Sequence, residues 1–328
     1  MLTESAIHAR DVSSLVGIAR LAAESKVLSA KRQVEYRSLE SRSILNRCRN
    51  PRMSFSWTIN PYRGCEVGCR YCYARYTHEF MGLEASKLFE TEIEAKSEAA
   101  ALLRRDLRRP CSGTIAIGTS TDPYQPAEKK FGVTRELLEV FAEGAGRELS
   151  ITTKGEGVAR DLDLLRAISE KNRLSVNITV TTVDADLSRL LQPRAPWPDL
   201  RLAALSALAD AGIQTGVFAS PILPWITDGA GQREDLGRAA CDAGARFLSG
   251  GPLFLKESAR QEFVPMLREH FPHLVADYEQ LYRWDAYPKG GTVEAIEQTL
   301  RGVREQFGLL AAAVFAGPLM NSQLSLFD

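Results

Sequence analysis

The feature that most restricts the fold of this chain is a regular alternation of short apolar runs with longer amphipathic stretches. The stretch after each run is long enough for a helical crossover, which favours parallel neighbouring strands over hairpins. The pattern therefore predicts βα units that build a partial barrel or a doubly wound sheet. Six runs are predicted as strands: Trp57–Asn60, Thr114–Gly118, Leu149–Thr153, Ser175–Thr182, Gln214–Ala219 and Arg246–Ser249.

The intervening stretches have helical periodicity. Leu137, Leu138 and Phe141, for example, fall on one helical face. Thr134 and Asp199 are predicted to cap the starts of two helices, and Gly212 to end one. Helices are predicted at Ile93–Arg108, Thr134–Glu143, Arg160–Glu170, Asp199–Ala211, Gln232–Ala243, Lys256–Glu269 and Thr292–Gln306.

The composition is that of an ordinary globular protein, with 45% hydrophobic and 25% charged residues. Forty-one basic and 41 acidic residues cancel, which argues against binding nucleic acid through bulk charge but not through a local groove. Six cysteines are too few for a secreted disulfide scaffold. Residues 1–30 lack the apolar core of a signal peptide, and Leu309–Ala316 is too short to span a bilayer. We therefore expect a cytoplasmic protein that is not bound to a membrane.

Three parts are expected along the chain. Residues 1–50 are modestly basic and are predicted to form an N-terminal extension that wraps the main domain. Residues 51–290 hold the six βα units, and residues 291–328 provide a C-terminal helix and a flexible tail. The expected fold class is thus α/β with additions at both ends.

Cys65, Cys69 and Cys72 lie close together directly after the first predicted strand, and glycines around them favour a loop. A structural zinc site usually takes four ligands in two separated pairs, and here the nearest further ligand is His78. Three cysteines on a four-iron cluster leave one iron open to bind a small molecule. The triplet therefore favours a reactive cluster, with a structural thiol triplet as the alternative.

The spacing C-x3-C-x2-C, with the aromatic Tyr71 before the last cysteine, resembles the radical S-adenosylmethionine (SAM) superfamily. The resemblance implies an enzyme with a partial (β/α)6 TIM-like barrel and a [4Fe–4S] cluster bound by Cys65, Cys69 and Cys72. It also implies that SAM binds the open iron and that an electron donor drives its cleavage. The resulting 5′-deoxyadenosyl radical then abstracts hydrogen from a substrate, in a reaction of lyase or oxidoreductase type.

Further strings resemble the spore photoproduct lyase-like branch, often labelled DNA repair photolyases. They are Gly118–Pro126 after the second strand, Thr153–Lys154 after the third and Ser220–Asp228 after the fifth. By position, the resemblance implies that Lys154 contacts the carboxylate of SAM and that Tyr71 lies near its adenine. It also implies that the SAM amino group is contacted by Gly118, Thr119, Ser120 and Thr121. Further polar contacts to SAM are implied for Ser175 and Asn177.

Alternatives stay open for several of these polar residues. Asp122 and Asn177 are equally well explained by hydrogen bonds within turns and the barrel. Arg160 is expected to pair with Asp163 or to cap a strand end.

One departure from this branch concerns the hydrogen donor. Spore photoproduct lyases carry a donor cysteine in a Cys-Thr-Ser-Asp run after the second strand, where this chain has Thr119–Asp122. A hydroxyl O–H bond is too strong to donate hydrogen as a thiol does, and Cys111 precedes the second strand at its other end. Cys48 and Cys241 are predicted to be small buried residues. Repair of the spore thymine lesion is therefore disfavoured, although the residues that start radical chemistry are present.

The stretch Gln323–Phe327 resembles the pentapeptide by which bacterial polymerases and repair proteins bind the DNA sliding clamp. Gln323, Leu324, Leu326 and Phe327 are the predicted contacts, since a clamp pocket would bury their apolar side chains. The alternative is that the tail packs on its own barrel.

Clamp binding would make DNA the expected substrate. The basic runs Lys31–Arg52 and Arg104–Arg109 would then contact phosphates, or else form solvated faces. Stacking on bases is a weaker expectation for five aromatic residues that could equally be core: Trp57, Tyr73, Tyr76, Trp197 and Trp225.

These observations predict a radical SAM enzyme that acts on DNA. A radical SAM enzyme on RNA, a peptide or a metabolite is one alternative, although no second cysteine cluster of the kind used in peptide maturation follows downstream. The other is a non-catalytic module, tethered to the clamp, that holds a structural zinc or an inactive cluster.

Overall fold

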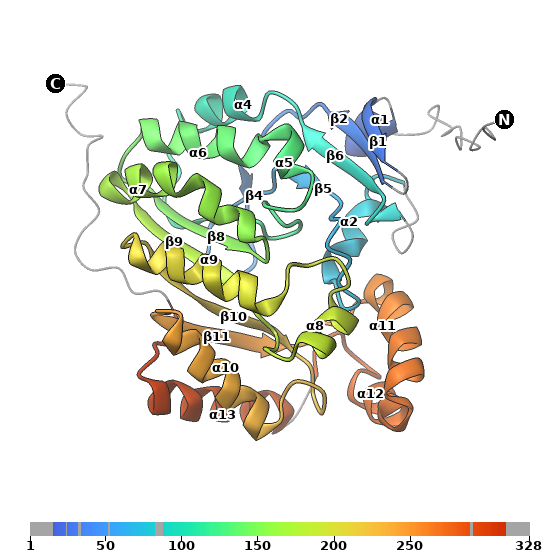
Figure 1. Ribbon diagram of the computed structural model, residues 1–328. Coiled ribbons are helices and arrows are strands. Elements are labelled where there is room, and N and C mark those ends of the chain that lie inside the picture. Colours follow the sequence, from blue (N-terminus) through green and yellow to red (C-terminus); the bar gives the residue numbers. More distant parts are fainter. Residues whose placement is uncertain are drawn as a thin grey trace.

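The computed structural model describes residues 16–23, 25–31, 34–51, 53–82, 88–288 and 291–312. Its main body is a seven-stranded sheet in the order β11-β10-β9-β8-β7-β4-β3 (Figure 1). The short β3 (Asn46–Arg47) is the antiparallel edge strand. The other strands are mutually parallel and follow chain order: β4 (Trp57–Ile59), β7 (Ile115–Ile117), β8 (Glu148–Thr153), β9 (Arg173–Thr179), β10 (Gln214–Ile222) and β11 (Phe247–Pro252).

This arrangement confirms the α/β class and the six predicted strands, and the chain has the fold of a partial (β/α)6 barrel. Apolar residues such as Ile151 and Val176 pack in the main core, while their neighbours Ser150 and Ser175 face one another across β8 and β9 on the other face. The helices of the βα units are α4 (Ala99–Asp106), α6 (Val133–Glu143), α7 (Leu162–Lys171), α9 (Pro198–Asp210), α10 (Ala230–Asp242) and α13 (Gly291–Phe307).

The helix predicted for Ile93–Arg108 is wrong at its start, because Glu92–Lys96 forms strand β6 before α4 begins. Ile93 and Ala95 alternate with charged residues and join the main core, which is the periodicity of a strand.

The predicted helix caps are wrong at Thr134 and correct at Gly212. Helix α6 starts after Gly132, and its first amides are bound by the carboxylate of Glu128, which accepts from the Thr134 N–H at 2.8 Å. Asp199 likewise lies inside α9, which starts after Trp197. Gly212 has φ +78° and follows the end of α9, as a left-handed terminating residue should.

The described part of residues 1–50 is joined to the core by strand pairing. After α1 (Gly17–Ala23), β1 (Lys26–Lys31) and β2 (Val34–Leu39) enter a second sheet of order β1-β2-β6-β5. Strand β5 (Tyr62–Arg63) directly precedes the cysteine loop. The N-terminal segment therefore supports the region that carries the cysteines.

A second hydrophobic cluster joins the cysteine loop to the segment after β11. It includes Cys65, Cys69 and Leu253 together with Phe263 and Tyr278. In the described residues, no helix is both long enough and apolar enough to cross a membrane. The other described helices, with η marking 3-10 helices, are η1 (Tyr73–Arg75), α2 (Tyr76–Glu79), α5 (Glu128–Phe131), η2 (Glu156–Asp161), α8 (Ala185–Leu191), α11 (Glu257–His270), η3 (Pro272–Leu274) and α12 (Val275–Leu281).

Candidate functional site

The three clustered cysteines lie on the loop between β5 and η1, and a glycine shapes its start. Gly64 has φ +74°, and a Cβ there would lie only 2.5 Å from the carbonyl oxygen of Glu92. No other residue type fits this turn without moving backbone. The Cys65 N–H donates to the carbonyl of Phe89 at 2.8 Å, which holds the first cysteine against the segment just before β6.

The thiols are reduced and shielded from solvent. Cys65 and Cys69 are buried and Cys72 is half-buried. Burial raises the pKa of the Cys65 thiol, and the negative charges of Asp122, Cys69 and Cys72 raise it further. Burial likewise raises the pKa of Cys72 to about 11, with Cys69 as the next cause. Both thiols therefore lie near Cys69, and the raised pKa values keep Cys65 and Cys72 protonated at neutral pH until a metal displaces their protons.

In the part of the chain that the structure describes, no three His, Cys, Asp or Glu side chains form a group that could hold a single metal ion. The Nε2 of His78, the nearest further ligand type in the sequence, lies 3.3 Å from the Glu92 carbonyl oxygen, and its ring packs on Phe89.

The buried residue Glu66 joins the cysteine loop to the N-terminal sheet and to the segment after β7. Glu66 is 2% exposed, and the Tyr36 hydroxyl on β2 lies 3.0 Å from each of its carboxylate oxygens. The Glu66 N–H donates to Oε1 of Gln125 at 3.0 Å. Gln125 in turn donates to the Gly64 carbonyl at 3.2 Å, so the loop is held on either side of Cys65.

A charged cluster holds the loop at Cys69. The buried Arg75 donates to the Cys69 carbonyl at 3.1 Å and pairs with Glu90, which also pairs with Arg194. Gly68 lies against this cluster, since a Cβ there would be 2.9 Å from Oε2 of Glu90. Both ends of the cysteine triplet therefore have a fixed backbone.

The segment predicted to contact the SAM amino group, Gly118–Thr121, is bonded to the cysteine loop. Asn60 ends the first strand, and its side chain accepts from the Ser120 N–H at 2.8 Å and donates to the Thr119 hydroxyl at 3.1 Å. The Thr121 hydroxyl donates to the Gly64 carbonyl at 2.7 Å. The ends of the first two strands thus form one hydrogen-bonded unit.

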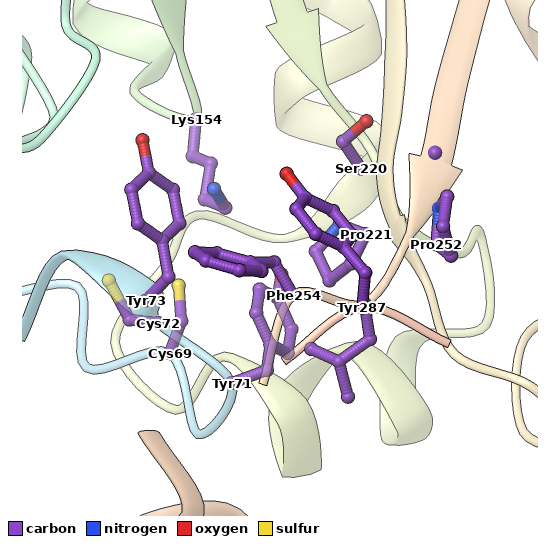
Figure 2. Close-up of a pocket in the computed structure, with 12 residues that line it drawn as sticks. Cys69, Tyr71, Cys72, Tyr73, Lys154, Ser220, Pro221, Pro252, Phe254 and Tyr287 are labelled. Carbon is purple, nitrogen blue, oxygen red and sulfur yellow. The ribbon is translucent and has the colours of Figure 1, made fainter. Parts of the chain in front are cut away.

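Asp122 has the structural role that sequence left open. Its carboxylate accepts from the Thr153 hydroxyl at 2.5 Å and from the Lys154 N–H at 2.7 Å. These bonds fix the end of β8 beside the loop after β7. The backbone of Lys154 is therefore held while its side chain extends along a cavity wall (Figure 2).

Ser175 and Asn177 lie on the inward face of β9 and are bonded within the barrel. The Ser175 hydroxyl donates to Oδ1 of Asn177 at 2.9 Å. The Asn177 amide donates to the Ser150 hydroxyl at 2.9 Å and to the Ile151 carbonyl at 3.0 Å. Neither residue lines the cavity beside the cysteines.

A cavity of about 330 Å³ lies at the carboxyl-terminal edge of the sheet, where a parallel barrel places its reactive groups. Figure 2 shows Cys69 and Cys72 on one wall, with Lys154 nearby and Tyr287 across the cavity. Tyr71 lines it as well; burial raises the pKa of its phenol, whose oxygen accepts from Gln192. The full lining is Cys69, Tyr71, Cys72, Tyr73, Lys154, Ser220, Pro221, Gly251, Pro252, Leu253, Phe254 and Tyr287.

Sequence reasoning assigned no role at this site to several residues, among them Asn60, Phe254 and Tyr287. Asn60 ends one predicted strand and Phe254 closely follows another, so the rule that sites gather at strand ends could have identified them. Tyr287 has no such signal, because its loop reaches the cavity through contacts with the distant residues Phe254 and Leu255.

The cysteines outside the triplet lie away from the cavity. Cys111 precedes β7 and its sulfur accepts from Arg147 at 2.7 Å, which confirms that it is at the opposite strand end from Gly118. The prediction that Cys48 and Cys241 are buried is wrong, since Cys48 is half-buried and Cys241 is exposed. Cys241 lies in α10 directly after Ala240, one of the residues that helix buries.

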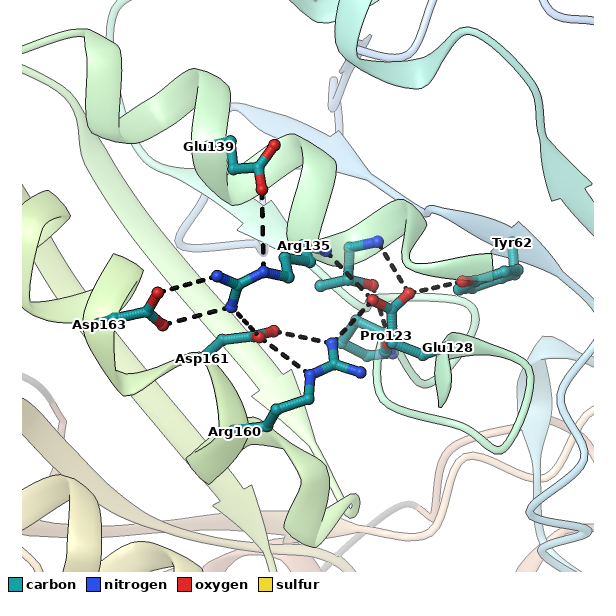
Figure 3. Close-up of polar contacts among 9 residues, drawn as sticks. Tyr62, Pro123, Glu128, Arg135, Glu139, Arg160, Asp161 and Asp163 are labelled. Atoms are coloured by element: carbon teal, nitrogen blue, oxygen red, sulfur yellow. Dashed lines mark hydrogen bonds and ion pairs between the residues drawn. The ribbon is translucent and has the colours of Figure 1, made fainter. Parts of the chain in front are cut away.

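Arg160 does not pair with Asp163 as expected. It pairs with Asp161 at 3.0 Å and with Glu128 at 3.2 Å, while Arg135 pairs with Asp163 at 2.8 Å. Figure 3 shows these contacts as dashed lines. Glu128 also accepts from the Tyr62 hydroxyl at 2.5 Å. This network joins β5, and so the start of the cysteine loop, to α6 and η2.

The remaining predicted contacts are less informative. Arg104 pairs with Glu143 at 2.5 Å and Arg105 pairs with Asp106 at 3.0 Å, as expected of a solvated helix face. The predicted clamp contacts Gln323, Leu324, Leu326 and Phe327 lie outside the described residues.

Comparison with known proteins gives a family match and a fold match. The model of the radical SAM superfamily matches residues 59–230. The uncharacterised protein Rv2578c of Mycobacterium tuberculosis is 35% identical over 257 residues, covering 77% of this chain and 75% of that protein. The uncharacterised protein MJ0683 of Methanocaldococcus jannaschii is 29% identical over 196 residues, covering 60% and 71%.

Among solved structures, spore photoproduct lyase complexed with dinucleoside spore photoproduct has a TM-score of 0.63 at 18% identity, covering 91% of this chain and 84% of that chain. A double mutant of the lyase with bound AdoMet and the same dinucleoside has a TM-score of 0.59 at 19% identity, covering 80% and 76%. At these identities the likeness concerns the fold.

Proposed function

This chain belongs to the radical SAM superfamily, and from that premise we propose that it starts radical chemistry on DNA in the cavity beside Cys69 and Cys72. Family membership makes it a radical SAM enzyme whose cofactors are a [4Fe–4S] cluster and SAM. The observation that carries the proposal is the position of two of the three loop thiols, Tyr71 and Lys154 around one cavity at the strand ends.

The cysteine loop fits the cluster. We assign Cys65, Cys69 and Cys72 as its ligands, since all three are free, close together and on a backbone that Gly64 and Arg75 hold in place. When bound, the cluster and SAM supply one-electron cleavage chemistry that yields a radical able to abstract hydrogen. An electron donor is therefore a required partner.

The residues near the loop divide the binding of SAM among them. Lys154 carries a flexible ammonium on a fixed backbone, which suits the carboxylate of SAM. Gly118–Thr121 is bonded to the cysteine loop and is assigned to the amino group, while Tyr71 is assigned to the adenine. For Ser175 and Asn177 the proposal keeps only a secondary polar role, since they bond to each other and to β8 and do not line the cavity.

DNA is the proposed substrate because the spore photoproduct lyases that share this fold bind a dinucleoside lesion. This chain is proposed to act on a different lesion. The run that carries the donor cysteine in those lyases is here Thr119–Asp122, and the Thr119 hydroxyl accepts from Asn60 instead of offering a thiol. A second proposed partner is the sliding clamp, bound through Gln323, Leu324, Leu326 and Phe327, which would bring the enzyme to DNA.

The proposal is tested with deuterated substrates. The protein is loaded with iron and sulfide without oxygen, reduced, and mixed with SAM and deuterated DNA that carries defined lesions. We expect deuterium to appear in 5′-deoxyadenosine with DNA and not in reactions with the Cys69→Ala variant. Transfer only from RNA or from metabolites of a cell extract would contradict the DNA assignment, and absence of SAM cleavage would contradict the enzymatic one.

A further inference from the structure

Aromatic rings form a continuous surface from the cysteine loop to the mouth of the cavity. Phe254 and Tyr287 stack with their ring centroids 4.4 Å apart and an interplanar angle of 27°. The ring of Tyr73, next to Cys72, lies 6.0 Å from that of Phe254. Tyr73 and Tyr287 are each 38% exposed, so this surface remains accessible.

A second hollow continues this surface outward. It measures about 240 Å³ and is lined by Trp284 together with Gln280, Leu281 and Asp285. Tyr287 lines both the cavity and this hollow, so the two meet at this residue. Trp284 is 81% exposed, an unusual position for the largest apolar side chain.

The backbone that presents Trp284 is held in place. The Leu255 N–H donates to the Ala286 carbonyl at 2.8 Å, and the Tyr287 N–H donates to Oδ1 of Asp285 at 3.2 Å. The backbone directly after Trp284 is therefore held against the segment that follows β11. An exposed aromatic ring beside a cavity is typical of a surface that binds a flat ligand.

We infer that Tyr287 divides a stacking site for two consecutive unpaired nucleobases, one against Phe254 in the cavity and the next on Trp284. The inference rests on the proposed function and specifies the form of its substrate. Every base has a π face, so aromatic platforms bind single strands with little regard to sequence. In a paired duplex these faces are covered, so the substrate is a single-stranded or extruded nucleotide.

The charges around the two hollows agree with a nucleic-acid strand. The Lys256 ammonium lies 4.0 Å from the ring centroid of Tyr76, and the Arg283 guanidinium lies 4.7 Å from that of Trp284, which lines the outer hollow. Cations beside stacking rings suit a chain of flat bases linked by phosphates. The acidic Asp285 in the outer hollow accepts a backbone hydrogen bond from Tyr287.

The test measures the affinity of the full protein for labelled oligonucleotides by fluorescence anisotropy. The probes are single-stranded DNA, single-stranded RNA, a matched duplex and a duplex with one unpaired base. We expect the single strands and the unpaired-base duplex to bind more tightly than the matched duplex. Trp284→Ala should weaken single-strand binding about tenfold, Trp284→Leu should weaken it equally, and Trp284→Phe should restore most of it because stacking needs a π face.

Trp197→Ala is the matched control. Trp197 is 40% exposed, and an arginine, Arg189, lies 3.9 Å from its ring centroid, but it lines neither hollow. Its removal should leave oligonucleotide affinity unchanged. Equal losses from Trp197→Ala and Trp284→Ala, or no loss from Trp284→Ala, would overturn the inference while deuterium transfer from DNA still upheld the proposed function. A parent protein that binds no oligonucleotide would overturn the inference and the DNA substrate together.

Discussion

The hydroxyl of Tyr36 should stabilise the cysteine loop from the N-terminal sheet. Tyr36→Phe removes the 3.0 Å hydrogen bond to the buried carboxylate of Glu66, the residue after Cys65. The ring itself keeps its packing, since its centroid lies 5.3 Å from that of Phe131. A hydrogen bond to a charged group contributes about 1.5–3 kcal/mol. Because Glu66 is only 2% exposed, water cannot replace the lost donor, and we expect the free energy of unfolding to fall by about 2 kcal/mol.

The assay is urea denaturation of the metal-free protein, followed by circular dichroism, with the slope against urea unchanged. Tyr282→Phe is the matched control, since Tyr282 is equally buried but donates to the neutral carbonyl of Leu253 at 3.0 Å. That loss should be only about 1 kcal/mol. A loss below ~0.5 kcal/mol for Tyr36→Phe, or equal losses in both variants, would refute the argument that a buried charge makes this contact important.

Three further predictions concern the cluster, pH and the tail. Cys69→Ala should abolish iron loading while Cys241→Ala, at an exposed position, should retain it; iron and sulfide analysis measures both. Burial, with Arg63 as the next cause, lowers the pKa of Lys96 from 10.5 to about 7. Between these values the unfolded chain binds more protons than the folded one, so burial of Lys96 costs the parent most stability near pH 7. In urea titrations, Lys96→Met should therefore be more stable than the parent, with the difference largest near pH 7 and smaller toward pH 10. A difference that is constant with pH would contradict the assigned cause. In a pull-down, the parent protein should retain the sliding clamp and the Phe327→Ala variant should not. Equal retention of the clamp by both proteins would contradict its proposed role as a partner.

The parallel βα architecture and the cysteine loop were predictable from local sequence patterns alone. The six strands could be read from local runs of residues because each run is contiguous and ends at turn signals. The proposed ligands Cys65, Cys69 and Cys72 could be predicted because one short loop carries all of them, so no long-range contact is needed to bring them near one another. Local patterns failed where a neighbour from elsewhere decided the outcome, as at Thr134, whose amide is bound by Glu128.

The surroundings of that loop depend on contacts between distant parts of the chain, which local patterns do not reveal. Tyr36 and Glu66 meet because β2 pairs with β6, and Phe254 and Tyr287 stack because the loop before α13 packs against the end of β11. Such contacts join residues far apart in the chain, and nothing in the neighbouring sequence marks either partner. The initiating chemistry therefore follows from a contiguous motif, while the shape that selects a substrate arises from packing between distant segments.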